Sequence, residues 1–460
     1  MATILRNRPL LIIAVGLMVG LTLFEYPWNA LFLLPAIWLL NRSAIKLLCL
    51  AASLGLGIYL RPPIFTEGVS KTQYVETQAR IVSVPRIYPG QISYEIEDRG
   101  VKYSVTEPDS ADRSIGDFVA IRGLAQPLRE GTESYKLSHG VVGQFRPIEV
   151  KVLSTGPQWL RSAAELRKRF VGFSAKYLPA DEARILDALC FNVEGGLDED
   201  LTNALRATGT IHIISASGLH VLVIAAALEF LLNLWPIPRP IKIGLVLIAL
   251  AFYAGAAGLQ PPILRSVVLA ATCLTAYLWR READLLSALS LAAILYLIYD
   301  PRGIYDVGFQ FSFVTVTAFC LFGSYHKADY STSPRRILSE VKVTIQTSCL
   351  AYFATIPLTA FYFGTISIVA VPANLAVFLS ASVLVIMGMV AFAASPFFPA
   401  LSEWLSAWLL SPLVQFVEKT ALMFGNLSIS SIPTLSFNGY WLVLIYGALL
   451  LRAKEPIREA

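Results

Sequence analysis

Long apolar runs, separated by short polar connections, fill most of the chain. About 20 apolar residues cross a membrane as one helix, so the runs at 9–25, 29–41 and 44–60 predict three early spans. Nine more are predicted at 211–235, 241–258, 262–279, 284–299, 304–323, 343–363, 368–394, 401–424 and 438–452. The pattern predicts an α-helical polytopic membrane protein of about 12 spans, in which single spans could be broken or re-entrant.

A different pattern occupies residues 61–157, where charges recur every few positions and apolar residues alternate with polar ones. This period of two is typical of strands with one buried face. Strands are predicted at 75–82, 91–97, 101–106, 118–124 and 141–152, with Gly, Pro and Asp turn signals between them. About five such strands favour an inserted small β-barrel of the OB-like type.

The chain therefore divides into four parts. Residues 1–60 form N-terminal transmembrane helices, 61–157 the β domain, 158–208 amphipathic and connecting helices at the membrane surface, and 209–460 a second, larger transmembrane domain. Between Trp159 and Phe173 apolar residues share one helical side, and a basic cluster runs from Arg161 to Arg169. Such helices commonly rest on anionic lipid, although the cluster could instead guide a polyanion.

Composition supports the membrane class, because the hydrophobic fraction is 55%, the charged fraction 15% and the mean hydropathy +0.61. Loop charge then sets orientation. If the N-terminus is in the cytoplasm, fifteen Lys and Arg residues lie in segments on the inside. The short outside connections contain only Arg302, and the outside count rises to three if Arg265 and Lys419 are included. Both termini are predicted to be cytoplasmic and the β domain to lie outside the inner membrane.

The segment 204–221 begins a span with small, hydroxyl and imidazole side chains instead of leucines. Polar groups at membrane depth persist where they face a bundle interior or a wet cavity. The candidates for lining a channel are His212, Ser215, Ser217, Gly218 and His220. Tight helix packing is an open alternative, and Ser217 with His220 could be the nucleophile and base of an intramembrane hydrolase.

Four further polar residues stand at expected span ends. Arg265 lies just inside a span, where it must be paired or wet, and it could contact phosphate or pair with Asp306. Asp306 and Gln310 are four residues apart and share a helical face. Asn374 follows Pro372, where it could bond exposed backbone. These residues could surround the mouth of one passage.

Taken together, the chain resembles the ComEC family of competence proteins. The resemblance is carried by His212 with the run Ser-Gly-Leu-His-Val at 217–221, Tyr253, Gly258, Arg265, the run Asp-Val-Gly-Phe-Gln at 306–310, Pro372 and Asn374. It implies an inner-membrane channel that imports single-stranded DNA during natural transformation. A secondary transporter or exporter of a small solute is the alternative, coupled to protons through Asp306 or His220.

Full-length members of that family continue into a metallo-β-lactamase-like domain with an H-x-H-x-D-H metal site. The four histidines of this chain cannot assemble that motif, and no G-x-x-x-x-G-K-[ST] phosphate loop is present. We therefore expect no enzyme activity, metal or cofactor. The expected partners are single-stranded DNA, membrane lipid, a separate nuclease, an outside DNA receptor, and a cytoplasmic motor or single-strand-binding proteins.

The β domain has no net charge, since residues 61–155 contain 12 Lys or Arg and 12 Asp or Glu. DNA affinity would therefore need a local patch of basic and aromatic residues. The candidates are Arg80, Arg86, Tyr88, Tyr94, Lys102, Tyr103 and Arg122. A solvated charge distribution around a structural barrel is the alternative.

Overall fold

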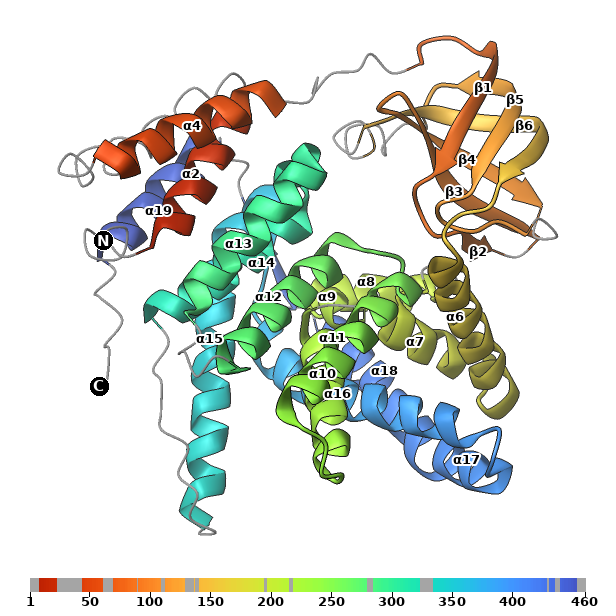
Figure 1. Ribbon diagram of the computed structural model, residues 1–460. Coiled ribbons are helices and arrows are strands. Elements are labelled where there is room, and N and C mark those ends of the chain that lie inside the picture. Colours follow the sequence, from red (N-terminus) through yellow and green to blue (C-terminus); the bar gives the residue numbers. More distant parts are fainter. Residues whose placement is uncertain are drawn as a thin grey trace.

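The computed structural model describes most of the chain. The described residues are 8–22, 44–60, 69–88, 90–108, 112–128, 136, 140–193, 197–214, 218–278, 284–322, 334–427, 430–434 and 439–452. The predicted span at 29–41 lies outside them, as do Ser215 and Ser217. Within this part the chain is mostly helical, with one six-stranded sheet and one two-stranded sheet (Figure 1).

The β domain has its strands where the alternation of apolar and polar residues predicts them. They are β1 (Gln73–Ile81), β2 (Arg86–Tyr88), β3 (Gln91–Asp98), β4 (Val101–Pro108), β5 (Phe118–Gln126) and β6 (Val141–Ser154). Only β2 was not predicted, because three residues are too few to display a period of two.

The strands of this domain pair in a closed cycle. The order is β1-β5-β6-β4-β3-β2, and β1 also pairs with β3. The β4–β6 pair is parallel, and the other pairs are antiparallel. Inside lie alternate apolar side chains, among them Ile96, Val105, Ile121 and Phe145, all at most 1% exposed.

Helices occupy the other apolar runs. They are α2 (Pro9–Thr22), α4 (Ala44–Leu60), α6 (Gln158–Tyr177), α7 (Ala180–Phe191), α8 (Glu199–Ala207), α9 (Ile211–Ile214), α10 (Gly218–Asn233), α11 (Arg239–Ala256), α12 (Pro261–Leu278), α13 (Leu285–Tyr299), the 3₁₀ turn η2 (Pro301–Tyr305), α14 (Val307–Phe322), α15 (Pro334–Phe363), α16 (Ala370–Ala394), α17 (Pro399–Leu405), the π-helical turn η3 (Ser406–Leu410), α18 (Ser411–Gly425) and α19 (Tyr440–Arg452). The short strands β7 (Thr365–Ser367) and β8 (Ser431–Pro433) pair with each other.

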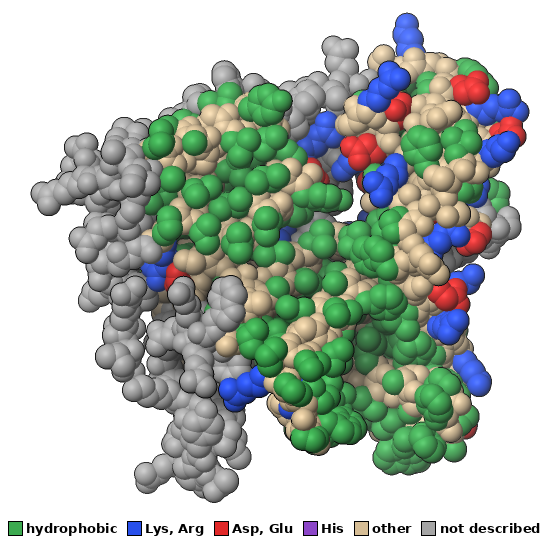
Figure 2. Space-filling model, in the orientation of Figure 1, with side chains coloured by type: hydrophobic (Ala, Val, Ile, Leu, Met, Phe, Trp, Pro, Cys, Tyr) green, Lys and Arg blue, Asp and Glu red, His purple; other side chains and the backbone are tan. Residues whose placement is uncertain are grey.

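Two helices in the described part, α11 and α16, are long and apolar enough to cross a membrane by length and composition. Shorter apolar helices lie at Pro9–Thr22, Leu48–Leu60, His220–Asn233, Pro262–Ala276, Leu285–Tyr299 and Val307–Phe322. Large apolar side chains are exposed on this body, including Phe230 at 67%, Ile248 at 69% and Leu379 at 68%. Figure 2 shows hydrophobic side chains over the helical part and charges gathered on the β domain and along α6.

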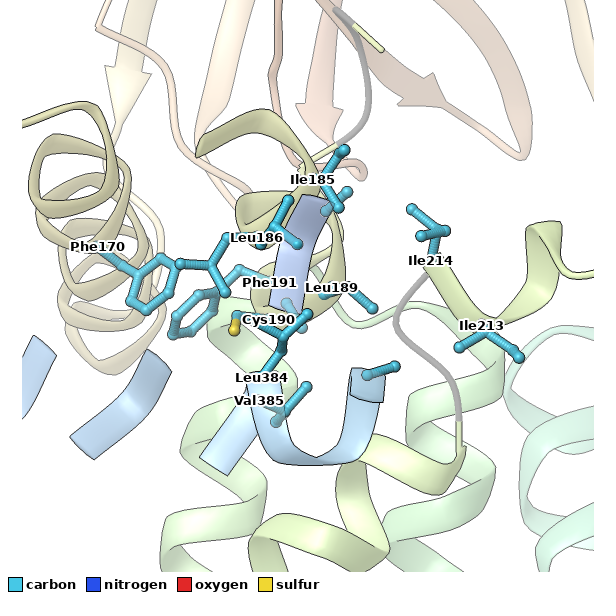
Figure 3. Packing of buried hydrophobic residues seen from close by; sticks show 14 of the residues in the cluster. Phe170, Ile185, Leu186, Leu189, Cys190, Phe191, Ile213, Ile214, Leu384 and Val385 are labelled. Carbon is cyan, nitrogen blue, oxygen red and sulfur yellow. The ribbon is translucent and has the colours of Figure 1, made fainter. Parts of the chain in front are cut away.

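The main helical core joins α6 and α7 to α10, α11, α16 and α18. Phe170 of α6 packs on Phe191 of α7, with ring centroids 4.8 Å apart, and on Phe392 of α16 at 5.3 Å. Gly388 allows α16 to approach α7 closely, because a Cβ there would lie 3.2 Å from Leu186. Figure 3 shows Leu186 and Cys190 of α7 beside Leu384 and Val385.

The apolar side of α6 packs on protein, whereas its predicted place at the membrane surface stays a prediction. Phe173 contacts Phe392, and a Cβ on Gly255 of α11 would lie 2.8 Å from Trp159. The described apolar face is thus occupied by α7, α11 and α16. The helical period of the apolar residues in α6 predicts correctly which side is buried. An amphipathic pattern does not, however, distinguish a protein neighbour from lipid.

Hydrogen bonds from two parts of the helical body, α6 and η2, help to hold the β domain against it. Asp117, fully buried, accepts hydrogen bonds from the Gly156 amide at 2.7 Å and from the Arg161 guanidinium of α6 at 3.1 Å. On another side, Arg302 of η2 donates to the Gly100 carbonyl at 3.4 Å. The domain therefore contacts the helices through both α6 and η2.

Candidate functional site

Arg265 lies on the first turns of α12 and is 3% exposed. Its Nη2 donates to the Gly308 carbonyl of α14 at 2.8 Å, and its Nη1 lies 3.9 Å from Asp306 Oδ1. The guanidinium also lies 5.2 Å from the Phe309 ring centroid and 5.9 Å from that of Tyr296 on α13. These cation–π contacts and the ion pair join three helices. The predicted partnership with Asp306 is present.

Asp306 also caps the N-terminus of α14. Its Oδ1 accepts the Phe309 amide at 2.6 Å, which satisfies a backbone donor left over at the helix start. One turn later, Gln310 donates to the Ile304 carbonyl at 3.0 Å and accepts from the Tyr362 hydroxyl of α15 at 2.8 Å. The predicted Asp306–Gln310 face thus connects α12, α14 and α15.

The segment rich in hydroxyl and imidazole groups packs tightly where it is described. His220 is 1% exposed, whereas His212 is exposed and its Nδ1 lies 2.9 Å from the Gly209 carbonyl. A Cβ on Gly218, at the start of α10, would clash with Ser266 of α12. Gly218 thus leaves room for the Ser266 hydroxyl where α10 packs on α12.

Sequence reasoning missed several members of this neighbourhood. The Thr208 and Thr210 hydroxyls are buried and 2.7 Å apart, just before α9. Tyr296 and Tyr362 come from ordinary apolar runs, which give no sign of a partner on another helix. Gly303 leaves room for the Tyr296 ring, since a Cβ at this position would lie 2.7 Å from the Tyr296 hydroxyl oxygen, but a single glycine in the sequence does not show which side chain fills that room.

Asn374 lies within the first turns of α16, as predicted. Its Oδ1 is buried and accepts no hydrogen bond from any residue that the structure describes. Within the described part, the Asn374 oxygen therefore does not make the hydrogen bond to nearby backbone that was expected of this side chain.

Five helices that contain or adjoin these residues pack in a ring. Contacts run from α10 to α12, α14, α15, α16 and back to α10 (labelled in Figure 1). Among described residues, helices that are not neighbours in this order share no extended packing. Gly218, Arg265, Gln310, Tyr362 and Asn374 all belong to this helical ring.

The β-domain candidates do not form one patch. Tyr94 is 2% exposed, and its hydroxyl donates to Glu107 at 2.5 Å, so its prediction as a DNA-contacting side chain is wrong. Burial, followed by this hydrogen bond, raises the pKa of Tyr94. Tyr103 is half-buried and packs edge-on against Phe145. Of the other candidates, Arg80, Arg86 and Arg122 are exposed and Lys102 is half-buried, whereas the Tyr88 side chain lies outside the described side chains.

The family model described as "Competence protein" matches residues 189–454, more than half of the chain. The chain belongs to the Competence protein family. The match spans the helical ring and every channel candidate named above. No solved structure matches.

The chain is also similar to two curated proteins. The chain is 22% identical over 306 residues to ComE operon protein 3 of Bacillus subtilis (strain 168), covering 65% of this chain and 38% of that protein. It is 31% identical over 152 residues to Competence protein ComA of Neisseria gonorrhoeae, covering 30% and 21%. The matched part thus spans less than half of either relative.

Proposed function

We propose that this chain forms the passage by which single-stranded DNA crosses the cytoplasmic membrane during transformation. The observation that carries the proposal is the helical ring, because all five helices fall within the family match at 189–454. A ring whose non-neighbouring helices share no extended packing, as here among the described residues, is the arrangement that a passage requires. The polar residues at its joints hold neighbouring helices in place around it.

The proposed setting is a multi-pass protein of the inner membrane with both termini in the cytoplasm. Exposed apolar side chains over the helical body support it, since patches of that extent are rare on soluble monomers. This topology puts the β domain, Gly258 and Arg302 on the outer side. In agreement with it, Gly258 lies against Val84 of the β domain, and Arg302 donates to Gly100.

The β domain is proposed to be an OB-type barrel. Supporting this, five strands pair in the cyclic order β1-β3-β4-β6-β5, with β4 and β6 parallel. A five-stranded Greek-key barrel of this kind commonly binds oligonucleotides. Its attachment through Asp117 and Arg302 would hold it beside the outer end of the helical ring.

Chemistry on the DNA is assigned to other proteins. We propose that this chain is a conduit, that a separate nuclease removes the second strand, and that a cytoplasmic motor or single-strand-binding proteins draw the strand inward. In this account Arg265 is a structural residue, since its guanidinium is buried among Asp306, Phe309 and Tyr296.

Deletion of the gene in a transformable host tests the proposal. We expect labelled DNA to remain bound at the cell surface, while the DNA recovered inside the cell and the number of transformants fall by several orders of magnitude. Complementation should restore both. Normal uptake in the deletion strain, with a new defect in handling a small solute, would instead support a transporter.

A further inference from the structure

One face of the β domain is open and built from three strands that are neighbours in the sheet. Along β1, alternate residues from Tyr74 to Arg80 point outward and are exposed, and the residues between them are more buried. The register puts Arg80 opposite Phe118 of β5 and Gln78 opposite Ala120, which in turn faces Lys151 of β6. The outward side chains of β1, β5 and β6 thus form one continuous surface, here called the outer sheet face.

Two aromatic rings mark the ends of this face. Tyr74 is 58% exposed, and Phe118 is 37% exposed. Phe118 pairs with Arg80, six residues along β1 from Tyr74, so the rings are about 20 Å apart along the strands at 3.3–3.4 Å per residue. Exposed aromatic rings beside basic residues are the groups on which the bases of a single strand stack.

Basic side chains lie beside and between the rings. The face carries Arg80, Arg122, Arg146 and Lys151 against two acids, Glu76 and Glu149, a balance of 4 − 2 = +2. The whole segment 61–155 has 12 basic and 12 acidic residues, so the rest of it has a balance of −2. Arg122 is ion-paired with Glu149. The neutral total therefore conceals a basic face.

The face is accessible in the assembled chain. Figure 1 shows β1, β5 and β6 on the side of the β domain away from the helices. One end of the face still adjoins the body, because Phe118 follows Asp117, which binds Arg161 of α6. A strand lying along the face would therefore be led toward α6 and the helical part.

We propose that the outer sheet face binds single-stranded nucleic acid, with Tyr74 and Phe118 stacking on bases and Arg80, Arg146 and Lys151 contacting phosphates. This inference rests on the proposed function and names the surface that receives the strand. It replaces the scattered candidates of the sequence pattern, of which only Arg80 and Arg122 lie on this face.

Binding of fluorescein-labelled oligo-dT to the full chain in lipid nanodiscs tests the proposal. Each stacked base contributes about 1–3 kcal/mol, so Tyr74→Ala with Phe118→Ala should weaken Kd by at least tenfold. Each lost phosphate contact lowers the slope of log K against log salt by about 0.7 for single strands. Arg80→Gln with Lys151→Gln should therefore lower that slope by about 1.4.

Arg86→Gln with Arg99→Gln is the matched control, because these exposed cations of the same domain lie off the face. It should bind as the parent does. Unfolding temperature and elution volume, measured for every variant, identify any that fails to fold, and Tyr74→Ala alone provides a milder substitution.

If both variants of the outer sheet face fold and still bind oligo-dT as the parent does, the proposal is overturned, whether or not their self-association changes. Equal losses in the control variant would do the same. Neither result touches the proposed function, which the deletion strain tests independently. Preference for oligo-dT over a duplex of equal length is the further expected result, since duplex bases are not available for stacking.

Discussion

At the scale of single residues, the buried carboxyl of Asp187 links α7 to α6. Ser174 Oγ lies 2.6 Å from Asp187 Oδ1 and 2.9 Å from the Val171 carbonyl oxygen. The Ser174 hydroxyl thus donates to the Asp187 carboxyl and also lies within hydrogen-bond distance of a carbonyl of its own helix. Burial raises the pKa of Asp187 to about 7, and the serine contact opposes it.

This carboxyl should make stability depend on pH. Its folded pKa exceeds its unfolded value, so the folded chain binds more protons between about pH 4 and pH 7 and the free energy of unfolding falls as pH rises through that window. At about 1.4 kcal/mol per pH unit, the fall is about 4 kcal/mol at most. Asp187→Asn should remove this slope in unfolding temperatures measured from pH 4 to 8.

Asp181→Asn on the same helix is the control, because Asp181 is exposed and pairs only at the surface with Arg184. Its pH profile should follow that of the parent. A parent profile that is flat from pH 4 to 7 would contradict the assignment of a proton to Asp187.

Inside the β domain, the buried Glu107 forms an ion pair with the half-buried Arg113. Glu107 accepts two hydrogen bonds from Arg113, at 2.9 and 3.1 Å, and one from Tyr94. Burial would lower the pKa of Arg113, but the bonds and charge of Glu107 raise it. Loss of the carboxylate would leave the half-buried Arg113 guanidinium without its counter-charge.

Glu107→Gln should therefore destabilise the β domain by about 3 kcal/mol, the scale for breaking one side of a buried pair. Glu149→Gln breaks the exposed pair with Arg122 in the same domain and should cost below about 1 kcal/mol. Urea-dependent protease cleavage within residues 69–154 would measure both. Similar losses of unfolding free energy in the two variants would contradict the greater burial of the Glu107–Arg113 pair.

Residue-level prediction from sequence succeeded where the neighbour was close along the chain. Asp306 and Gln310 were placed on one face by helical spacing, and that face is present. Tyr94 was wrongly chosen for its ring, although it alternates in phase with Ile92 and Ile96, which are buried. Strand period, applied strictly, would have put it inside.

At the scale of elements, small residues let α2 and α4 approach each other closely. Gly16 and Gly20 of α2, four residues apart, face Ser53 and Gly57 of α4. A Cβ on Gly57 would lie 2.5 Å from the Leu17 carbonyl oxygen. Close backbone approach through small residues at this spacing is a common way to pair helices in membranes.

Gly57→Leu should separate α2 from α4, because the added side chain meets backbone that cannot move aside. Gly55→Leu is a matched control, since nothing lies within 4 Å of a Cβ at Gly55. Disulfide cross-linking between cysteines introduced at Leu21 and Ile58 should fall at least tenfold in the first variant only. Equal cross-linking in both would contradict the α2–α4 packing.

The Arg265 junction permits a similar comparison for α12, α13 and α14. Arg265→Ala removes the bond to Gly308, the ion pair and both ring contacts, and it should reduce transformation at least a hundredfold with lowered protein level. Arg265→Lys keeps a charge near Asp306 but loses the planar fork, so its loss should be intermediate. Normal transformation with both variants would rule out a structural role.

Element positions followed from the sequence far better than element neighbours did. The helices within 211–452 and five strands begin and end within a few residues of the apolar runs and alternations that predict them, apart from α15, which begins at Pro334. Contacts of α6 were not predictable, because Phe392 lies 222 positions beyond Phe170 in the chain. Local periodicity gives the face that is buried but not what covers it.

At the scale of the whole molecule, contacts with α6, with η2 and with Gly258 after α11 hold the β domain against the helices, and five helices close a ring. The expected topology puts Arg302 outside and Arg8 inside. In the structure Arg302 bonds the β domain, while Arg8 bonds Asp284 through two atoms at 2.6 and 2.8 Å. Neither attachment nor ring closure could be derived from one sequence, since both depend on contacts between distant segments.

The central claim is that DNA passes through the helical ring. A photoreactive side chain introduced at Ser266, Gln310 or Asn374, in cells taking up labelled DNA, tests it most directly. The account predicts cross-links to the incoming single strand from these positions and none from Leu295, Ile298 or Trp408, which are exposed outside the ring. Efficient uptake with no cross-link from the ring, or with equal cross-links from both sets, would contradict it.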